Sequence, residues 1–385
     1  MRATRAVAVA TLALLVSAAC APSPPSGGGA AGPSDPGPSP PAATRAQATA
    51  GRPSIPLPAP SPGSLFGPAL NIDAPCANSR IEVLPDELIW QACDLARTQP
   101  TGQIVAYSFA THETRVLYEA RTPGFIAQLV RATARWLVWF EYSSTQRAMD
   151  GVLYAIPRDG GEPLVIQGAI PSAQQAHLAE ADLDGETLYW TVPVFEEGRW
   201  HGRLMRRQLP DGVPSIVLQA PPGAIITWPS VRYGLVAYEY SLETGTPKTQ
   251  VRYLTPDGAV HQIDRAPSSE PAIGEGFILF KRSERYEVGS ISAFLLADGR
   301  VIDFGGGEKA QADGRYGAWW SLTPGTKGMY LALPLAGCVV NVVDEAGAAA
   351  PWLGVGAVAR NYRDQEPQPR ERSRIWAARI GTINC

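Results

Sequence analysis

Two glutamates could do acid–base chemistry if the fold brings them together. Glu141 and Glu239 each follow closely after an aromatic residue in a strand-like phrase. Two carboxylates roughly 5 to 9.5 Å apart are what glycoside hydrolysis needs. Lys281 and Ser321 follow aromatics in the same way, so these polar groups could instead converge on one binding mouth. The alternative is that they point outward, toward solvent or a neighbouring sheet.

Aromatic residues at strand ends or in loops are a second candidate for recognition, because Tyr and Trp are enriched at binding surfaces. The alternative is that they pack between sheets. Six residues have this character: Tyr142, Phe195, Trp200, Trp228, Tyr240 and Tyr286. With the polar positions they predict one binding surface, made of Glu141, Tyr142, Trp228, Glu239, Tyr240 and Lys281.

Other catalytic and metal-binding patterns are missing from the sequence. The four histidines are not within metal-ligand spacing of one another: His112, His177, His201 and His261. The sequence has no Gly-x-Ser-x-Gly elbow, and the triple glycine at 305–307 does not lead into a phosphate-binding loop. We therefore expect no metal, no cofactor and no catalytic residue. An enzyme that acts on glycans is the alternative.

A strand-like phrase with a central aromatic recurs along the chain. Its aromatics are spaced by 49, 51, 48, 42 and 40 residues: Trp90, Trp139, Trp190, Tyr238, Phe280 and Trp320. Each phrase is followed by a second strand-like phrase, then in most units by a turn that is often Asp-Gly and a short apolar strand. Runs rich in β-branched and aromatic residues form strands, and Asp-Gly supplies the positive φ of a tight hairpin.

Small antiparallel sheets bury their faces and hide their edges by stacking around an axis, and about 40 to 50 residues is the period of a propeller blade. The sequence therefore predicts an all-β fold, a β-propeller of seven blades with three or four strands each; six blades is the alternative. We expect residues 68–72 to supply the missing outer strand of the last unit. The units are 79–121, 125–170, 176–221, 225–266, 270–306, 309–347 and 350–382.

In period and strand order, residues 79–382 resemble the TolB-like and WD40-like bacterial propellers. That family often carries Trp-Ser-Pro-Asp-Gly before the second strand, where this chain has only Leu183-Asp184-Gly185 and Ala312-Asp313-Gly314. The resemblance implies the architecture. It implies no activity, because one fold serves many functions.

Cys20 ends a sequence typical of an export signal. Arg2 and Arg5 precede an apolar run over residues 6–16, and Ser17-Ala18-Ala19 stands before the cysteine. A cysteine directly after small residues resembles a bacterial lipobox, which implies cleavage before Cys20 and a diacylglyceryl anchor on its thiol. The alternative is an ordinary secretory signal that contains a cysteine.

The domain organisation follows from this signal. Residues 1–19 are the signal peptide, and residues 20–66 are a Pro-, Gly-, Ala- and Ser-rich tether with too little apolar bulk to fold. Residues 67–385 form the propeller domain. We expect an extracytoplasmic protein that its lipid holds at the cell membrane or the outer membrane.

Four further cysteines remain: Cys76, Cys93, Cys338 and Cys385. An even number in an exported chain favours disulfides. We favour the pairs Cys76–Cys93 and Cys338–Cys385, which close the shorter loops. The alternative pair, Cys76–Cys385, would join the two ends of the ring.

Charge narrows the choice of partner. Removal of residues 1–19 takes away Arg2 and Arg5, so the formal net charge goes from −3 to −5. The absence of a basic block or a basic–aromatic stripe argues against a nucleic-acid partner. We expect a non-catalytic binding or scaffold module of the cell envelope whose partner is a protein or a glycan. A purely structural spacer is a further alternative.

Overall fold

The computed structural model describes residues 57–59, 61–74, 80–94, 99–143, 151–168, 180–242, 249–283, 288–321, 328–343, 348–363 and 373–385. The chain divides into two compact units, residues 1–42 and 43–385, and all described residues belong to the second. Cys20 and most of the predicted tether therefore lie outside the described residues. Within the described part, no helix has the length and hydropathy of a membrane span.

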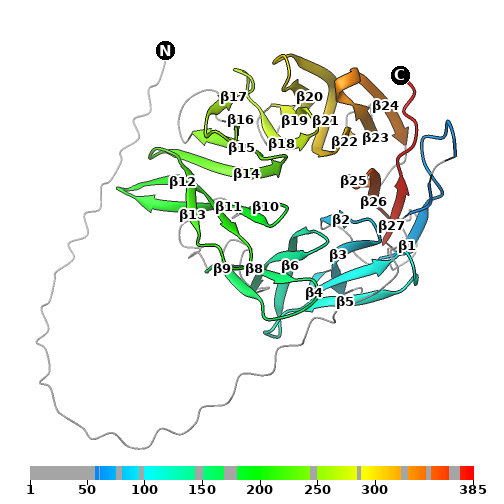
Figure 1. The fold of residues 1–385 in the computed structure, drawn as a ribbon, viewed down its shortest axis with the longest axis horizontal. Helices are drawn as coiled ribbons and strands as arrows, with labels where there is room; N and C mark the ends of the chain where they lie inside the picture. The colour runs from blue at the N-terminus through cyan, green and yellow to red at the C-terminus, as the bar shows by residue number, and fades with distance from the viewer. Residues whose placement is uncertain are drawn as a thin grey trace, which may run out of the picture. The chain divides into compact units, whose positions relative to one another are not determined.

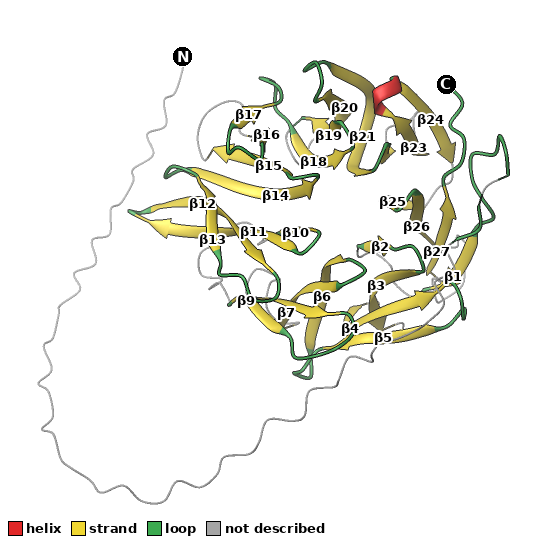
Figure 2. Cartoon of the chain, viewed as in Figure 1, coloured by secondary structure: helices red, strands yellow, loops and turns green. Residues whose placement is uncertain are grey.

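In the described residues, twenty-seven strands form antiparallel sheets that follow one another along the chain, and Figures 1 and 2 show their arrangement. Blade 1 consists of β2 (Ile81–Val83), β3 (Glu87–Asp94), β4 (Gln99–Ser108) and β5 (Thr114–Glu119), and blade 2 consists of β6 (Phe125–Ala132), β7 (Trp136–Ser143), β8 (Val152–Pro157) and β9 (Leu164–Gln167). Blade 3 consists of β10 (Ala181–Asp184), β11 (Thr187–Glu196), β12 (Arg199–Gln208) and β13 (Ser215–Gln219). Blade 4 consists of β14 (Ala224–Arg232), β15 (Leu235–Leu242), β16 (Thr249–Leu254) and β17 (Val260–Gln262).

Blades 5 and 6 share one long strand, and blade 7 combines the two ends of the domain. Blade 5 consists of β18 (Ser269–Gly274), β19 (Phe277–Arg282), β20 (Gly289–Leu295) and the first half of β21 (Val301–Asp313). Blade 6 consists of the second half of β21 with β22 (Tyr316–Ser321), β23 (Gly328–Leu333) and β24 (Cys338–Val343). Blade 7 consists of β25 (Ala348–Gly354), β26 (Ala357–Arg363), β27 (Ser373–Arg379) and β1 (Leu70–Asp73).

The long strand β21 explains why one sheet has seven strands. Its first half pairs with β20, from Phe294↔Val301 to Gly289↔Gly307, and its second half pairs with β22 as far as Asp313↔Tyr316. The first half is therefore the outer strand of blade 5, and the second half is the first strand of blade 6. The described residues thus contain seven four-stranded blades, which confirms the predicted fold.

Strand β1 closes the ring, because it pairs with β27 from Leu70↔Ala377 to Asp73↔Arg374. This pairing agrees with the expectation that residues 68–72 complete the last blade. The first strands of successive blades contact one another from β6 through β25, and β25 contacts β2. These strands form the inner layer of the ring (Figure 1).

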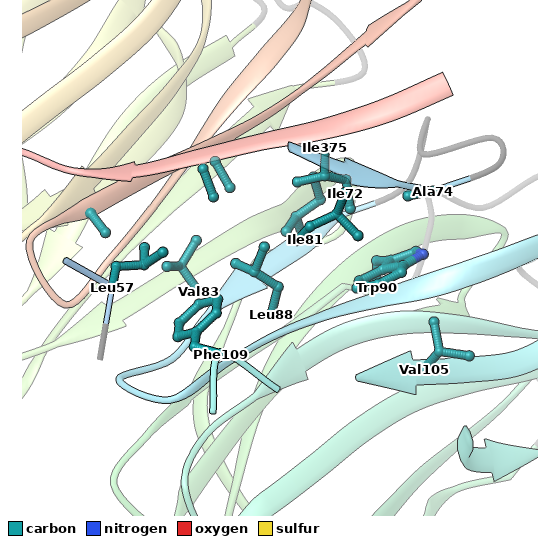
Figure 3. Packing of buried hydrophobic residues seen from close by; sticks show 13 residues of the cluster. Leu57, Ile72, Ala74, Ile81, Val83, Leu88, Trp90, Val105, Phe109 and Ile375 are labelled. Carbon is teal, nitrogen blue, oxygen red and sulfur yellow. The ribbon is translucent and has the colours of Figure 1, made fainter. Parts of the chain in front are cut away.

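Seven apolar clusters fill the spaces between successive blades. Figure 3 shows the cluster between blades 7 and 1, where Trp90 and Ile81 meet Ile375 and Ile72. In six blades an aromatic residue of the second strand packs toward the preceding blade and is at most 2% exposed: Trp90, Trp139, Trp190, Tyr238, Phe280 and Trp319. The repeated aromatics are thus the wedges that hold neighbouring blades together.

The predicted alignment of blade 6 is wrong by one residue. Ala318 pairs with Gln311 as Leu279 pairs with Ala272 in blade 5, so Trp319 rather than Trp320 corresponds to Phe280. Trp320 enters the cluster with blade 7 instead. Successive side chains on a strand point to opposite faces, and two adjacent tryptophans gave the sequence no means of choosing between them.

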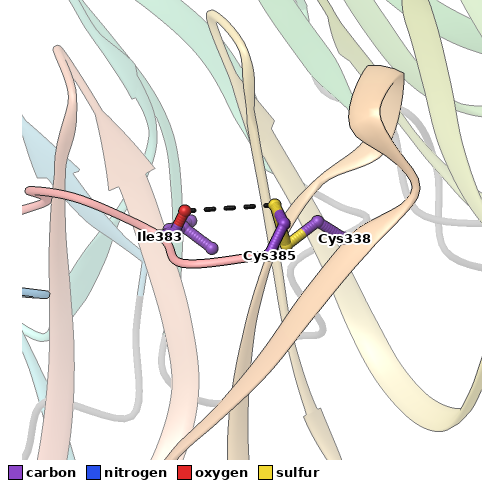
Figure 4. Close-up of a disulfide and its surroundings, with 3 residues drawn as sticks. All are labelled: Cys338, Ile383 and Cys385. Atoms are coloured by element: carbon purple, nitrogen blue, oxygen red, sulfur yellow. Dashed lines mark hydrogen bonds between the residues drawn. A yellow bond between two sulfur atoms is a disulfide. The ribbon is translucent and has the colours of Figure 1, made fainter.

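A disulfide joins Cys338, the first residue of β24, to Cys385 at the chain end, with 5.5 Å between the two Cα atoms (Figure 4). It links blade 6 to the segment that follows β27. This is one of the two pairs favoured from sequence. Cys76 and the side chain of Cys93 lie outside the described residues, so the second pair stays a prediction.

Candidate functional site

The inner strands of blades 4, 5 and 6 each contain a β-bulge at the same place. The register shifts between Thr227 and Ser230 in β14, and equivalent shifts occur in β18 and β21. One residue at each bulge has a left-handed backbone: φ is 53° at Trp228, 56° at Glu270 and 54° at Lys309. We call these three the bulge residues. Such values are uncommon for residues other than glycine.

A carboxylate satisfies the backbone N–H of each bulge residue, which the strand ladder leaves unpaired. Glu180 of blade 3 accepts the bond from Trp228. Glu239 accepts from Glu270 over 2.7 Å, and Glu270 accepts from Lys309 over 2.7 Å. Each of these three bonds crosses from one blade to the next. We call them the carboxylate latches.

A buried ion pair lies at the centre of this group. The Nζ atom of Lys281 is 2.9 Å from Oε1 of Glu270. Lys281 is 2% exposed and Glu239 is 1% exposed. Buried charges are tolerated when they are paired and hydrogen-bonded, and this geometry meets that condition. Glu239 thus joins blade 4 to blade 5, and Lys281 balances the charge of Glu270 within blade 5.

Two bulge residues reach the surface. Trp228 is 38% exposed, and Lys309 is exposed with no ion pair to any residue that the structure describes. The nearby Tyr240 ring lies under Arg252, whose guanidinium carbon is 3.6 Å from the ring centroid. Of the predicted surface, the structure therefore brings Trp228, Glu239, Tyr240 and Lys281 into blades 4 and 5.

Glu141 and Tyr142 lie in blade 2, apart from that group. Tyr118 of blade 1 donates a hydrogen bond to Glu141, and Tyr142 donates to Gln128 over 3.2 Å. Burial, followed by the hydrogen bond to Glu141 and its charge, raises the pKa of Tyr118 far above the usual value for tyrosine. Glu141 is therefore engaged on the side of blade 2 that faces blade 1.

Glu141 and Glu239 do not occupy equivalent positions. Trp139 and Tyr238 correspond in register, but Glu141 stands two residues after Trp139, whereas Glu239 stands one residue after Tyr238. Because side chains alternate along a strand, the two carboxylates point to opposite faces of their blades. The repeat therefore does not place them as an acid pair.

A chain of ion pairs along the first strands is a feature that the sequence did not reveal. Arg131 lies 3.2 Å from Glu82 and 3.1 Å from Asp182, so it joins blades 1, 2 and 3. Arg80 extends the chain at Glu82, over 2.5 Å, and Arg232 extends it at Asp182, over 3.5 Å. Burial alone would lower the pKa of Arg131, but the Glu82 and Asp182 carboxylates outweigh that effect and raise it.

The bulges had a sequence signal, although a faint one. Trp228 and Glu270 are each followed by a proline, and proline inside a strand is confined to edges and bulges. Glu180 and Lys309 carried no comparable signal. Their roles depend on a partner about one blade away in the sequence.

Two of the histidines, His201 and His261, make contacts within their own blades. His201 is buried, with Nδ1 3.2 Å from the Ala220 carbonyl and Nε2 3.2 Å from Glu196. His261 stacks on Tyr253, with 4.9 Å between ring centroids. His177 and Tyr286 lie outside the described residues. Among the residues that can be searched, no group of three or more His, Cys, Asp or Glu side chains is arranged to hold a metal ion.

Comparison with known proteins agrees with the fold. No family model and no characterised protein sequence matches this chain. Acylaminoacyl peptidase from Pyrococcus horikoshii is similar in structure with a TM-score of 0.53 and 9% identity over 79% of this chain and 52% of that one. Oligogalacturonate lyase from Vibrio parahaemolyticus is similar with a TM-score of 0.52 and 9% identity over 81% of this chain and 91% of that one.

TolB from Acinetobacter baumannii aligns with a TM-score of 0.39 and 11% identity over 77% of this chain and 78% of that one. At these identities the likeness to solved structures is one of fold alone. The strand topology identifies the described part of the chain as a β-propeller of seven blades, and the comparisons with solved structures agree with that fold.

Proposed function

We propose that this protein is an exported, lipid-anchored propeller that binds a partner at the cell envelope without catalysis, through the inner edge of blades 4 to 6. One observation carries the proposal. The predicted acids Glu141 and Glu239 are buried and accept hydrogen bonds from the protein itself, whereas Trp228 and Lys309 present an aromatic ring and a cation to solvent. Aromatic residues in such positions dominate binding energy at many interfaces.

The binding surface is tested by crosslinking the full chain in envelope preparations and identifying the bound species. Trp228→Ala combined with Lys309→Ala should lower specific recovery about tenfold, the effect of losing about 1.4 kcal/mol. Ile216→Ala is the matched control, because Ile216 is 52% exposed on the outer strand β13. If the parent, the double variant and the Ile216→Ala control recovered equal amounts of the partner, this surface would not be the binding site.

The anchor is tested separately, because Cys20 lies outside the described residues. We expect labelled palmitate to be incorporated into the chain and the protein to fractionate with membranes. Cys20→Ser should abolish the label and release the protein. Unchanged labelling in that variant would refute the lipobox interpretation.

A glycan-acting enzyme is the second candidate, since oligogalacturonate lyase has the same fold over most of both chains. Both a lyase and a hydrolase produce a new reducing end, but only a lyase leaves an unsaturated sugar at the other new end. Incubation of the full chain with pectic and other acidic polysaccharides, followed by assays for both products, tests this candidate. Sustained turnover would show that the protein is an enzyme rather than a non-catalytic binding module.

A further inference from the structure

We infer that His201 makes the β11–β12 hairpin sensitive to pH, because its imidazole needs both ring protons to match the two acceptors beside it. The hairpin extends past the rest of blade 3 (Figure 1). β10 pairs with β11 only as far as Trp190, and β13 pairs with β12 only from Arg203 onward. Residues 192–202 therefore form a two-stranded ribbon, and ribbons of two strands are marginally stable in water.

Neighbouring segments hold this ribbon on one side. The Gly223 N–H group donates to the Trp200 carbonyl over 2.8 Å. A Cβ atom at Gly202 would lie 2.2 Å from a backbone nitrogen of β14, so only glycine permits this approach of blade 3 to blade 4. At the tip, Phe195 is 49% exposed and packs on Trp200 with 5.1 Å between ring centroids. The order of the tip therefore depends on the contacts that the ribbon makes along its own length.

His201 is a buried polar residue of this ribbon, with 2% of its surface exposed. Its Nδ1 atom is 3.2 Å from the Ala220 carbonyl oxygen, and its Nε2 atom is 3.2 Å from the Glu196 carboxylate. A neutral imidazole has one N–H and one lone pair, so it matches only one of two acceptors, whereas an imidazolium has a proton for each. Because Nε2 is buried, water cannot replace the contact that the neutral form loses.

The hairpin itself carries four charged side chains besides His201. Glu196 contacts His201 and also accepts a hydrogen bond from Arg203 over 2.8 Å. Glu197 and Arg199 are exposed at the tip, where their opposite charges balance. Glu196 is therefore the carboxylate whose contact distinguishes the two protonation states of His201.

The elements beside the hairpin add no further charge in the part of the chain that the structure describes. Residues 215–227, which cover β13 and the start of β14, contain no charged side chain. Tyr142, on the side of blade 2 that faces β11, stays neutral at physiological pH because burial raises its pKa.

The direction of the pH effect follows from ordinary titration. Histidine side chains generally gain their second proton near about pH 6.5, and glutamates gain theirs near about pH 4.3. Between these values an imidazolium at His201 faces an ionised Glu196, and both contacts of the ring hold the ribbon together. Toward about pH 8 the ring is neutral, one contact is lost, and the tip with its aromatic pair becomes less ordered.

Hydrogen exchange of the full chain in detergent, followed by mass spectrometry at about pH 5.5 and about pH 8, tests the inference. After correction for the intrinsic effect of pH on exchange, protection of the N–H groups of residues 192–202 should fall about fivefold or more at the higher pH. Blade 5 contains no histidine and is the internal reference. His201→Gln and Glu196→Gln should each remove most of this pH dependence. His261→Gln removes an exposed histidine of blade 4 and should behave like the parent.

Three outcomes would overturn the inference. They are equal protection of residues 192–202 at the two pH values relative to blade 5, the parent's pH dependence in His201→Gln, and the parent's pH dependence in Glu196→Gln. The Glu196 side chain is 49% exposed, so Glu196→Gln tests the contact even if His201→Gln does not fold. The inference does not rest on the proposed binding surface, and its failure would leave that surface unaffected.

Discussion

The ring is held together in two different ways on its two sides. Around blade 7, which we call the seam, β1 pairs with β27, Phe66 packs on Trp376 with 5.1 Å between ring centroids, and a disulfide ties blade 6 to the chain end. Across blades 3 to 6, the carboxylate latches join neighbours, and the Lys281–Glu270 pair lies within blade 5 beside them. Apolar clusters separate the blades on both sides, but the seam adds strand pairing and a covalent bond, whereas the latched side adds buried carboxylate bonds.

The difference follows from chain connectivity. Neighbours on the latched side are adjacent in sequence, so bringing them together closes only short loops. The seam unites residues about 300 positions apart, such as Asp73 and Arg374, and the entropy of closing a loop grows with its length. A covalent bond and a shared sheet offset that larger cost. The two sides should therefore respond differently to substitution.

The largest effect should come from removing the strand that closes the seam. A chain that lacks residues 1–73 loses β1 together with Leu57 and Ile72, both buried in the cluster between blades 7 and 1. Burial of two such side chains contributes about 3 to 6 kcal/mol. We expect chemical denaturation to show a loss of at least that size or no cooperative transition.

The matched control for this deletion lacks only residues 1–55 and keeps Leu57 and β1. It should unfold like the full chain. If the longer deletion were equally stable, closure by β1 would not hold the ring together.

The next largest effect should come from Lys281→Ala on the latched side. It leaves the Glu270 carboxylate buried without its ion pair, which costs about 3 to 5 kcal/mol. The free energy of unfolding from urea titration measures this loss. Adding Glu270→Gln should recover part of it, and a single variant as stable as the parent would show that the pair does not stabilise the ring.

Removing the disulfide should lower the free energy of unfolding slightly less than Lys281→Ala does. Cys338→Ser with Cys385→Ser opens a loop with a sequence separation of 47 residues, and loss of such a cross-link costs roughly 2 to 4 kcal/mol. The same urea titration, with and without reductant, checks this. Reductant should lower the stability of the parent more than that of the double variant, which keeps the predicted Cys76–Cys93 pair; an equal loss in both proteins would contradict the assignment.

Alkaline pH should lower the stability of the ring, in part through Tyr238 on the latched side. Burial raises the pKa of Tyr238 to about 12, whereas an unfolded tyrosine titrates near pH 10. Between about pH 10 and about pH 12 the unfolded state loses a proton that the folded state keeps. The contribution of the Tyr238 phenol to the free energy of unfolding is therefore fully present below about pH 10. Above that pH it falls by up to about 1.4 kcal/mol per pH unit.

Urea titrations over this pH range measure the slope of stability against pH. Tyr238→Phe should reduce that slope and leave stability at neutral pH nearly unchanged. At the seam the corresponding residue is Asn361, which has no phenol to titrate. A slope unchanged by the substitution would show that Tyr238 is not responsible.

The smallest effect should separate backbone strain from packing at Trp228. Trp228→Gly and Trp228→Ala both remove the indole, but only glycine adopts φ of 53° without strain. We expect the glycine variant to be about 1 kcal/mol more stable than the alanine variant. Differential scanning calorimetry measures the difference. Equal stability would mean that the bulge relaxes when the indole is absent.

The blades could be predicted from the sequence, because their determinants are local. Alternating apolar residues, central aromatics and turns such as Asp257-Gly258 act within about ten residues of one another, and Gly258 adopts the expected positive φ of 88°. The outer strand at residues 68–72 was inferred because the seventh unit lacked one. That inference needed only a count of strands.

The site could be predicted only in part. Trp228, Glu239 and Lys281 were recognised by residue type, but the sequence grouped them with Glu141, which faces a different blade. The latches and the chain through Arg131 were missed altogether. Each joins residues roughly 30 to 50 positions apart, and a shift of one residue in register reverses the face of every side chain.

The sequence by itself therefore determined the strands, the blade repeat and a segment able to close the ring, because hydrophobic periodicity and turn residues act over short distances; the structure decided for seven blades rather than six. Only the tertiary structure decided which carboxylates accept hydrogen bonds between blades and which side chains remain at the surface. That choice depends on bulges and register between neighbouring blades, where a displacement of one residue turns a buried latch into an exposed group.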